Sequence, residues 1–331
     1  MQVSRTLESI TTKYPFLSSI IETTALTLQP GEMEATISKI DSGLWAWKQK
    51  TNHNRMIELQ RDEPAPEDGP VELAYFGSSA FRITSPAGIT VMIDPWRNFP
   101  TRRWDWYFRD FPISKVDIGV STHPHFDHDA LHRLDAHVLL DRLIGTYEFG
   151  DIRITGIADK HATDSSSAVY DFKKIIRYFD DIDITPPNNP RSWDHCLFLI
   201  ETGGLRILAW GDNRHDPPEG IWQRLGKIDI ALLPIDGSQH VMGFRHTEQI
   251  IETLRPKVVV PHHYYIFDVT VRQSTLQPVD PWVVQRGENA RWLDGPAATY
   301  SRADLQGLEA RVDFFGGNVA FDKERWLAER E

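Results

Sequence analysis

Short apolar runs recur from Val71 onward, and they constrain the fold more than any other feature of the chain. They are joined by turn residues, as at positions 77–79 and 86–88, and stretches with helical spacing lie between them, at 130–135 and 246–255. The runs are VELAYF, FRIT, ITVMID, VDIGVST, AHVLLD, DIRITGI, CLFLIET, LRILAW, DIALLP and KVVVP. Strands before, between and after helices predict an α/β layer structure, with large sheets covered by helices.

The first 70 residues have a different pattern. Apolar residues at helical spacing run through residues 1–60, and the segment RDEPAPEDGP at 61–70 combines prolines and acids that resist both helix and sheet. The sequence therefore predicts a helical extension and linker over 1–70, followed by one catalytic domain over 71–331. The extension either covers the core or contacts a second copy of the chain.

Composition excludes several classes of protein. Lys and Arg number 36 against 47 Asp and Glu, a net charge of -11, which argues against a protein that binds nucleic acid through clustered cations. The single cysteine, Cys196, excludes an intrachain disulfide and a cysteine-based zinc site. With no apolar signal segment and no long apolar stretch, we expect a cytoplasmic protein without a membrane span.

The segment Ser121 to Asp129 reads STHPHFDHD and directly follows the apolar run VDIGV. In an extended segment, His123 and His125 share one face and can reach one cation, while a turn lets Asp127 and His128 reach a second. Imidazole and carboxylate ligands suit zinc, iron or manganese. The alternative, a polar loop whose histidines cap a helix, fits a lone histidine better than HxHxDH at a strand end.

This motif resembles that of the metallo-β-lactamase fold superfamily, and the order of the surrounding segments extends the resemblance over about residues 71–268. The segments GSSAFRIT and GITVMIDPW resemble the branch that contains L-ascorbate-6-phosphate lactonases and N-acylphosphatidylethanolamine phospholipase D. The resemblance implies a four-layer αβ/βα sandwich of two mixed sheets with helices outside.

The resemblance also implies further ligands. His161 follows the run DIRITGI where a third histidine is expected, and Asp212 follows LRILAW and a glycine, where the superfamily has a bridging aspartate. The segment KVVVPHHYY offers two histidines, and the branch pattern of proline, one residue, histidine, tyrosine selects His263 over His262. The implied set is His123, His125 and His161 on one cation, Asp127, His128 and His263 on the other, and Asp212 between them.

Such a centre implies hydrolysis by a hydroxide that two divalent cations share. Zinc is the expected metal, with manganese and iron as alternatives. The substrate is a small ester, lactone or amide, or a phosphodiester. Asp127 is also a candidate to orient the attacking oxygen, and Tyr264 is either an oxyanion donor or a packed aromatic.

Substrate selection is expected from the segment at 94–112, which contains seven aromatics and four arginines. Trp96, Trp104, Trp106 and Tyr107 are candidates for an apolar pocket, with Arg97, Arg102, Arg103 or Arg109 meeting an anionic group. The alternative is an aromatic cluster in the core or in a subunit interface.

The remaining histidines have mostly structural interpretations. His53, His132, His137 and His195 are expected to be surface or packed residues. His215, His240 and His246 follow motifs of the superfamily, and His246 is the candidate for substrate contact. Asp236 stands where the branch often has glycine, which weakens any transfer of a particular substrate.

Three other functions compete with small-molecule hydrolysis. A di-iron redox protein of the same fold typically has a carboxylate at the second position of the motif, where this chain has His125. A nuclease or phosphodiesterase acting on nucleic acid conflicts with the acidic charge. A catalytically silent binding protein conflicts with ligands at every expected position.

Overall fold

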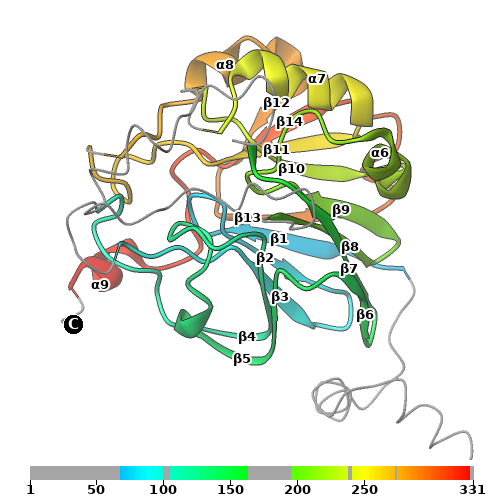
Figure 1. Ribbon diagram of the computed structural model, residues 1–331. Helices are drawn as coiled ribbons and strands as arrows, with labels where there is room; N and C mark the ends of the chain where they lie inside the picture. Colours follow the sequence, from blue (N-terminus) through cyan, green and yellow to red (C-terminus); the bar gives the residue numbers. More distant parts are fainter. Residues whose placement is uncertain (1–67, 100–104, 163–194, 238–240, 273, 329–331) are drawn as a thin grey trace, which may run out of the picture. The chain divides into compact units, whose positions relative to one another are not determined.

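The computed structural model describes residues 68–99, 105–162, 195–237, 241–272 and 274–328, and the predicted helical extension therefore lies outside the described residues. Strands in these ranges form two mixed sheets that face each other (Figure 1). The smaller sheet has six strands, in the order β13-β1-β2-β3-β4-β5. Their bounds are Val71–Tyr75 for β1, Phe81–Thr84 for β2, Thr90–Ile93 for β3, Ser114–Ser121 for β4, Leu134–Asp141 for β5 and Ala297–Tyr300 for β13.

The larger sheet has eight strands, in the order β12-β14-β11-β10-β9-β8-β7-β6. Its strands from β9 to β12 are parallel to their neighbours, and those from β6 to β9 are antiparallel. The bounds are Gly145–Phe149 for β6, Ile152–Asp159 for β7, His195–Thr202 for β8, Leu205–Ala209 for β9, Ile230–Pro234 for β10, Val258–His262 for β11, Ala290–Trp292 for β12 and Arg311–Phe314 for β14.

The central parallel strands are buried along their whole length. Every residue of β10 and β11 is buried, which explains why both read as continuous apolar runs rather than as alternating ones. Helix α7, Phe244–Leu254, turns Ile250, Ile251 and Leu254 inward, and it lies with α6, Glu219–Leu225, and α8, Asp280–Val284, on the outer side of the larger sheet (Figure 1). The sandwich predicted from the sequence is confirmed.

The prediction of a helix over residues 130–135 was wrong. A single 3-10 turn, η2, spans Leu131–Arg133, and Leu134 already pairs with Ser114 of β4. Leu134 and Asp135 pair with β4 in a parallel ladder, and a short helix would not provide these backbone partners. This pairing therefore outweighs the helical spacing of the segment.

The last part of the chain completes both sheets. Strand β13 pairs with β1 in the smaller sheet, whereas β12 and β14 extend the larger one. A second 3-10 turn, η5, spans Gly287–Asn289, and helix α9, Lys323–Ala328, packs Trp326 edge-on against Trp96. The sequence analysis predicted none of these three strands.

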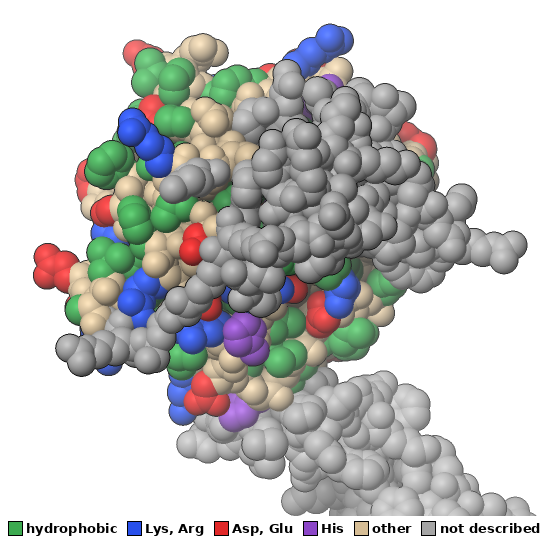
Figure 2. Space-filling model, turned by 60° about the vertical axis from the view of Figure 1, so that its left-hand side comes forward, with side chains coloured by type: hydrophobic (Ala, Val, Ile, Leu, Met, Phe, Trp, Pro, Cys, Tyr) green, Lys and Arg blue, Asp and Glu red, His purple; other side chains and the backbone are tan. Residues whose placement is uncertain are grey.

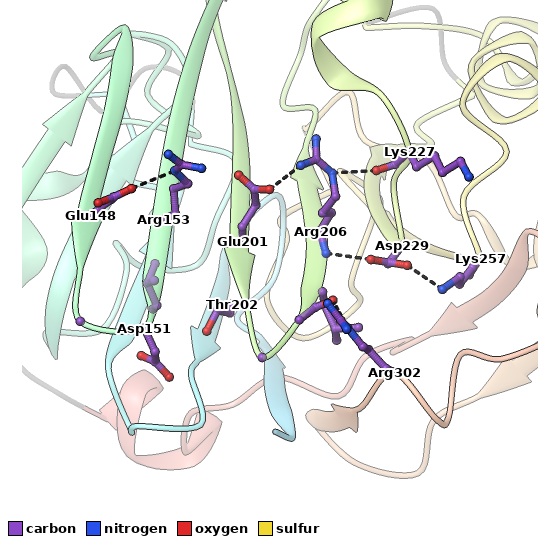
Figure 3. Close-up of a pocket in the computed structure, with 15 residues that line it drawn as sticks. Glu148, Asp151, Arg153, Glu201, Thr202, Arg206, Lys227, Asp229, Lys257 and Arg302 are labelled. Atoms are coloured by element: carbon purple, nitrogen blue, oxygen red, sulfur yellow. Dashed lines mark hydrogen bonds and ion pairs between the residues drawn. The ribbon is translucent and has the colours of Figure 1, made fainter. Parts of the chain in front are cut away.

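A groove of about 720 Å³ crosses the larger sheet where β7, β9, β10 and β11 begin (Figure 3). Its charged side chains pair with one another: Glu148 with Arg153, Glu201 with Arg206, and Asp229 with Lys257. The opposite end of the same strands carries the candidate metal ligands, so the groove and the candidate centre lie at different ends of the sheet. Among the described helices, none has the length and apolar character to span a bilayer.

Candidate metal centre

The candidate ligands lie in loops that follow strands of both sheets. The HxHxDH segment follows β4, His161 follows β7, Asp212 follows β9 and His263 follows β11. Backbone contacts hold two of these loops together, since Ala162 N donates to Asp212 O at 2.8 Å and His161 forms an isolated bridge with Asn213. Segments far apart in the sequence therefore meet at one edge of the sandwich.

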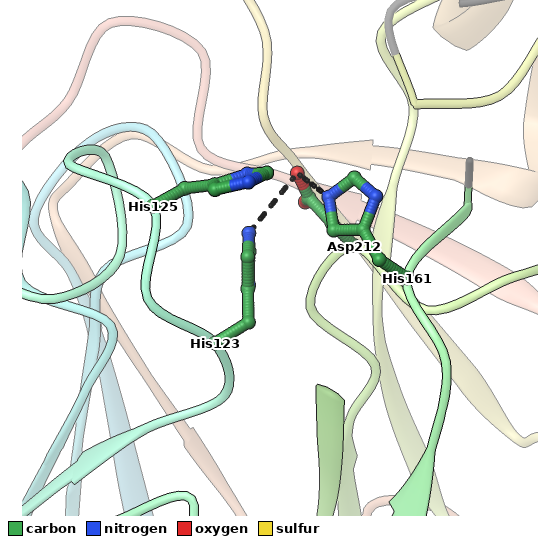
Figure 4. A group of neighbouring side chains, drawn as sticks. All are labelled: His123, His125, His161 and Asp212. Atoms are coloured by element: carbon green, nitrogen blue, oxygen red, sulfur yellow. Dashed lines mark ion pairs between the residues drawn. The ribbon is translucent and has the colours of Figure 1, made fainter. Parts of the chain in front are cut away.

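One group of candidate ligand atoms comes from His123, His125, His161 and Asp212 (Figure 4). The four atoms all lie within 4.8 Å of one another. The Nε2 atoms of His123 and His161 lie 3.7 and 3.6 Å from Asp212 Oδ2. His125 is partly exposed, and the other three residues are buried.

A second group comes from Asp127, His128, Asp212 and His263, again within 4.8 Å of one another. His263 Nε2 lies 3.1 Å from Asp127 Oδ2, and His128 Nε2 lies 3.3 Å from Asp212 Oδ1. Asp212 belongs to both groups and is the residue that joins them.

The chemistry of these atoms fits cations. Among the described residues, His123 Nε2, His128 Nε2 and Asp212 Oδ1 are buried without a hydrogen bond, although the last two lie 3.3 Å apart. Buried polar atoms without partners are rare because each one loses its hydration. Imidazole nitrogens and a carboxylate oxygen converging in this way are ligands suited to zinc and to other divalent transition metals.

Asp94, directly after β3, holds both ends of the HxHxDH segment. Its Oδ2 lies 2.9 Å from His128 Nδ1, and its carboxylate accepts hydrogen bonds from Thr122 N and Thr122 Oγ1, both at 2.7 Å. Thr122 Oγ1 in turn lies 3.1 Å from His123 Nδ1. The sequence analysis missed this role, although the acid ends the apolar run ITVMID.

The two groups differ in how readily their histidines are protonated. Burial lowers the pKa of His123 well below its usual value and that of His125 to about 3, with neighbouring histidines adding to the effect. Burial also opposes protonation of His128 and His263, but Asp212 and Asp127 outweigh it and raise the pKa of both. In the metal-free protein protonation is therefore disfavoured at His123 and His125 and favoured at His128 and His263.

The structure separates the two adjacent histidines at the end of β11. His263 joins the second group, whereas His262 packs edge-on against Phe81 and lies 3.1 Å from Ser79 Oγ through its Nδ1. His263 has a φ of 61°, and its N donates to Ser78 O. This left-handed backbone turns the second histidine away from the strand direction and into the centre.

Several candidates for substrate contact instead stabilise the fold. Trp96 is fully buried, stacks on Tyr107 at 4.2 Å and donates from its indole to Phe76 O. Tyr107 is buried and donates to Ser78 Oγ. Arg97 binds Asp129 through two nitrogens. Trp96 and Tyr107 thus form the core cluster that was the alternative prediction.

Other candidates have mixed placements. Tyr264 is buried and its hydroxyl donates to Gly316 O, which places it as a packed aromatic rather than as an oxyanion donor. Trp106 is also buried and lies edge-on to His263, with ring centroids 6.2 Å apart. His246 stacks on His215 at 3.9 Å. Trp104 lies outside the described residues, as do Arg102, Arg103, His53 and His240.

The remaining polar residues have structural placements. His132 is exposed and His137 half-buried. Asp236, in place of a glycine, is buried and accepts hydrogen bonds from the backbone N of Val241 and Met242, so it shapes the loop before α7. His195 is packed, as expected, but against the candidate ligands.

The comparisons with known proteins agree with this geometry. A family model described as the beta-lactamase superfamily domain matches residues 72–263. A protein of Pyrobaculum islandicum named a UPF0173 metal-dependent hydrolase is 27% identical over 241 residues, covering 67% of this chain and 100% of its own. A UPF0173 metal-dependent hydrolase of Anaeromyxobacter is 26% identical over 235 residues, covering 62% and 78%.

A solved structure supports the fold. A Thermotoga maritima protein, described as a Zn-dependent hydrolase of the metallo-beta-lactamase superfamily, has a TM-score of 0.50 and 19% identity, covering 74% of this chain and 97% of its own. The narrower resemblance to lactonases and a phospholipase D stays a prediction. The matched family, the two-sheet fold and the clustered histidines and aspartates together show that this chain belongs to the beta-lactamase superfamily and is a metal-dependent hydrolase.

Proposed function

We propose that the chain is a dinuclear hydrolase that cleaves a small ester, lactone, amide or phosphodiester. The observation that carries the proposal is the pair of four-atom groups sharing Asp212. Two divalent cations, when bound, lower the pKa of water toward 7 and act as Lewis acids on the scissile bond. Zinc is the favoured metal, because the first group contains three histidines, a ligand set that catalytic zinc sites use.

Each side chain has a separate task in this proposal. The first cation would be held by His123, His125 and His161, and the second by Asp127, His128 and His263. Asp212 would bind both cations. Asp127 Oδ2 lies 3.1 Å from His263 Nε2. Burial alone would raise the pKa of Asp127, but His128 and His263 outweigh burial and hold this pKa well below the usual value. Its carboxylate is therefore ionised and able to orient the attacking oxygen by accepting a hydrogen bond.

Aromatic side chains beside the centre favour a substrate with an apolar part. Phe126, within the HxHxDH segment, meets Trp106 edge-on at 5.2 Å and Phe99 at 6.2 Å. Trp106, which is itself buried, extends this aromatic cluster to His263. Arg97 is committed to Asp129, so we do not assign it to an anionic substrate group.

Two observations argue against the alternative functions, a di-iron redox protein and a nuclease or phosphodiesterase acting on nucleic acid. A histidine, not a carboxylate, stands at position 125 in the first group, against a di-iron redox centre. On the face drawn in Figure 2, Lys and Arg side chains of the described residues are interspersed with Asp and Glu and form no continuous basic surface, against a nucleic-acid substrate. A cytoplasmic location and a homo-oligomeric state remain part of the proposal.

The test combines metal analysis with substrate panels. Protein purified without chelator should carry up to two equivalents of divalent metal, and it should turn over one of the ester, lactone, amide and phosphodiester panels. His123→Ala should lower kcat/KM by about a hundredfold or more, because a ligand contributes at least as much as the groups that orient it. His132→Ala removes an exposed histidine and is the control. Full activity of metal-free protein would refute the proposal.

A further inference from the structure

His195 lies directly behind the first group of candidate ligands. It begins β8, is 1% exposed, and stacks on His123 with ring centroids 5.2 Å apart and an interplanar angle of 29°. Its ring also meets His161 edge-on at 6.5 Å. Neither group of converging ligand atoms includes His195, so its place is behind the ligands rather than among them.

Three ligand-bearing loops meet around this imidazole. The backbone N of Cys196 donates to Thr122 O at 2.9 Å, which ties the start of β8 to the HxHxDH segment. His195 pairs with Asp159 at the end of β7, two residues before His161. At the third loop, a Cβ on Gly211 would lie 2.7 Å from His195 Nε2.

The close approach at Gly211 shows how completely the ring fills this space. The same Cβ would lie 2.6 Å from Thr122 Oγ1, and Gly211 has a φ of 55° that few other residues adopt readily. The imidazole is thus wedged between His123 on one side and the turn that carries Asp212 on the other.

A packing role in an ordinary core does not explain a histidine here. Among the described residues, neither ring nitrogen of His195 has a hydrogen-bond partner, and burying such atoms destabilises a fold relative to an apolar side chain. The contacts that the ring does make are with candidate ligands and with the glycine beside a candidate ligand.

We propose that His195 is a positioning residue for the first metal site. Its ring face fixes the imidazole of His123, and its edge sets the spacing between the HxHxDH loop and the Gly211-Asp212 turn. This inference rests on the proposed function, because it concerns the geometry of ligands for a cation.

The experiment measures metal affinity rather than turnover. Metal-free wild type, His195→Ala and His195→Phe would be titrated with Co²⁺ and with Zn²⁺ against a chromophoric chelator, and the visible absorption of bound Co²⁺ would report ligand geometry. Cys196→Ala is the matched control, because Cys196 is the next buried residue of β8 and faces away from His195. Thermal unfolding of each metal-free variant separates local effects from loss of the fold.

Removing the ring should weaken binding at the first metal site about 10- to 100-fold, the usual effect of losing a group that orients a ligand, and should change the Co²⁺ spectrum. His195→Phe retains an aromatic face and should stay close to the wild type in affinity. Cys196→Ala should leave the affinity and the spectrum unchanged.

The proposal is overturned if His195→Ala binds Co²⁺ and Zn²⁺ like the wild type, or if folded His195→Phe loses as much affinity as His195→Ala. The second outcome would assign the effect to a ring nitrogen instead of the ring face. If His195→Phe does not fold, the comparison of His195→Ala with Cys196→Ala decides alone. Failure of the wild type to bind either metal would refute the proposed function and is distinguishable from these results.

Discussion

Replacing Asp94 with asparagine tests whether a carboxylate outside the ligand set controls the metal centre. The substitution keeps the shape of the side chain and removes its charge. Asp94 has a φ of 45°, and asparagine tolerates this left-handed backbone as well as aspartate does. The backbone should therefore stay in place while the contact with His128 Nδ1 changes from charged to neutral.

The expected magnitude comes from three hydrogen-bonding contacts of the Asp94 carboxylate, two from Thr122 and one with His128. Hydrogen bonds to a charged group contribute about 1.5–3 kcal/mol, against about 0.5–1.5 kcal/mol between neutral partners. Losing the charged acceptor of a histidine ligand typically lowers metal affinity about 10- to 100-fold, which corresponds to roughly 1.4–2.7 kcal/mol. We expect Asp94→Asn to weaken binding at the second group within this range.

Asp117→Asn is a closely matched control. Asp117 is buried and accepts hydrogen bonds from Thr90 N and Thr90 Oγ1, as Asp94 does from Thr122, and Thr90 is not beside a candidate ligand in the sequence. Chelator competition and kcat/KM would be compared for both variants, with thermal unfolding of the metal-free forms. The reasoning fails if Asp94→Asn binds metal like the wild type, or if Asp117→Asn weakens binding equally.

Three further predictions concern protons, packing and reactivity. The pKa of His128 and of His263 is raised, and both side chains must be neutral to bind a cation. The second equivalent of metal should therefore release protons at neutral pH, and its affinity should rise with pH. Calorimetry in buffers of different ionisation enthalpy measures this release, and finding none would contradict the prediction. Trp96→Ala should lower the free energy of unfolding by about 3–5 kcal/mol, measured by urea denaturation, and a loss below about 1 kcal/mol would contradict its place in the core. Burial raises the pKa of the Cys196 thiol to about 12, so iodoacetamide should modify it only after denaturation, and rapid labelling of native protein would count against this.

The strands that carry the candidate centre could be predicted because their signal is local. The runs VDIGVST, DIRITGI, LRILAW and KVVVP became β4, β7, β9 and β11, since apolar residues between turns need only their own sequence to be recognised. Strands β12 to β14 gave no such signal. They have three or four residues each, partly exposed, and owe their existence to pairing with distant strands.

The candidate site, too, could be predicted only where its signal is local. The HxHxDH spacing and the resemblance indicated which residues to bring together, but Asp94 reaches His128 over 34 positions through the parallel pairing of β3 and β4, which no local pattern reveals. The aromatic composition of the segment after β3 did not predict which way each of its side chains points. Because neither helical nor strand periodicity runs through it, the sequence did not reveal that Trp96 and Trp106 are both buried, nor that Trp106 lies edge-on to His263.

The origin of the ligands in both sheets has a consequence for folding. Asp127 and His263 are 136 positions apart and meet only after the two sheets have docked. Closing loops of this length is entropically unfavourable until the intervening apolar strands have packed, and contacts of this kind form late. A metal ion therefore cannot nucleate the sandwich. The chain completes its interior first and then acquires its ions, which add to the stability of the folded state because the complete ligand set exists only there.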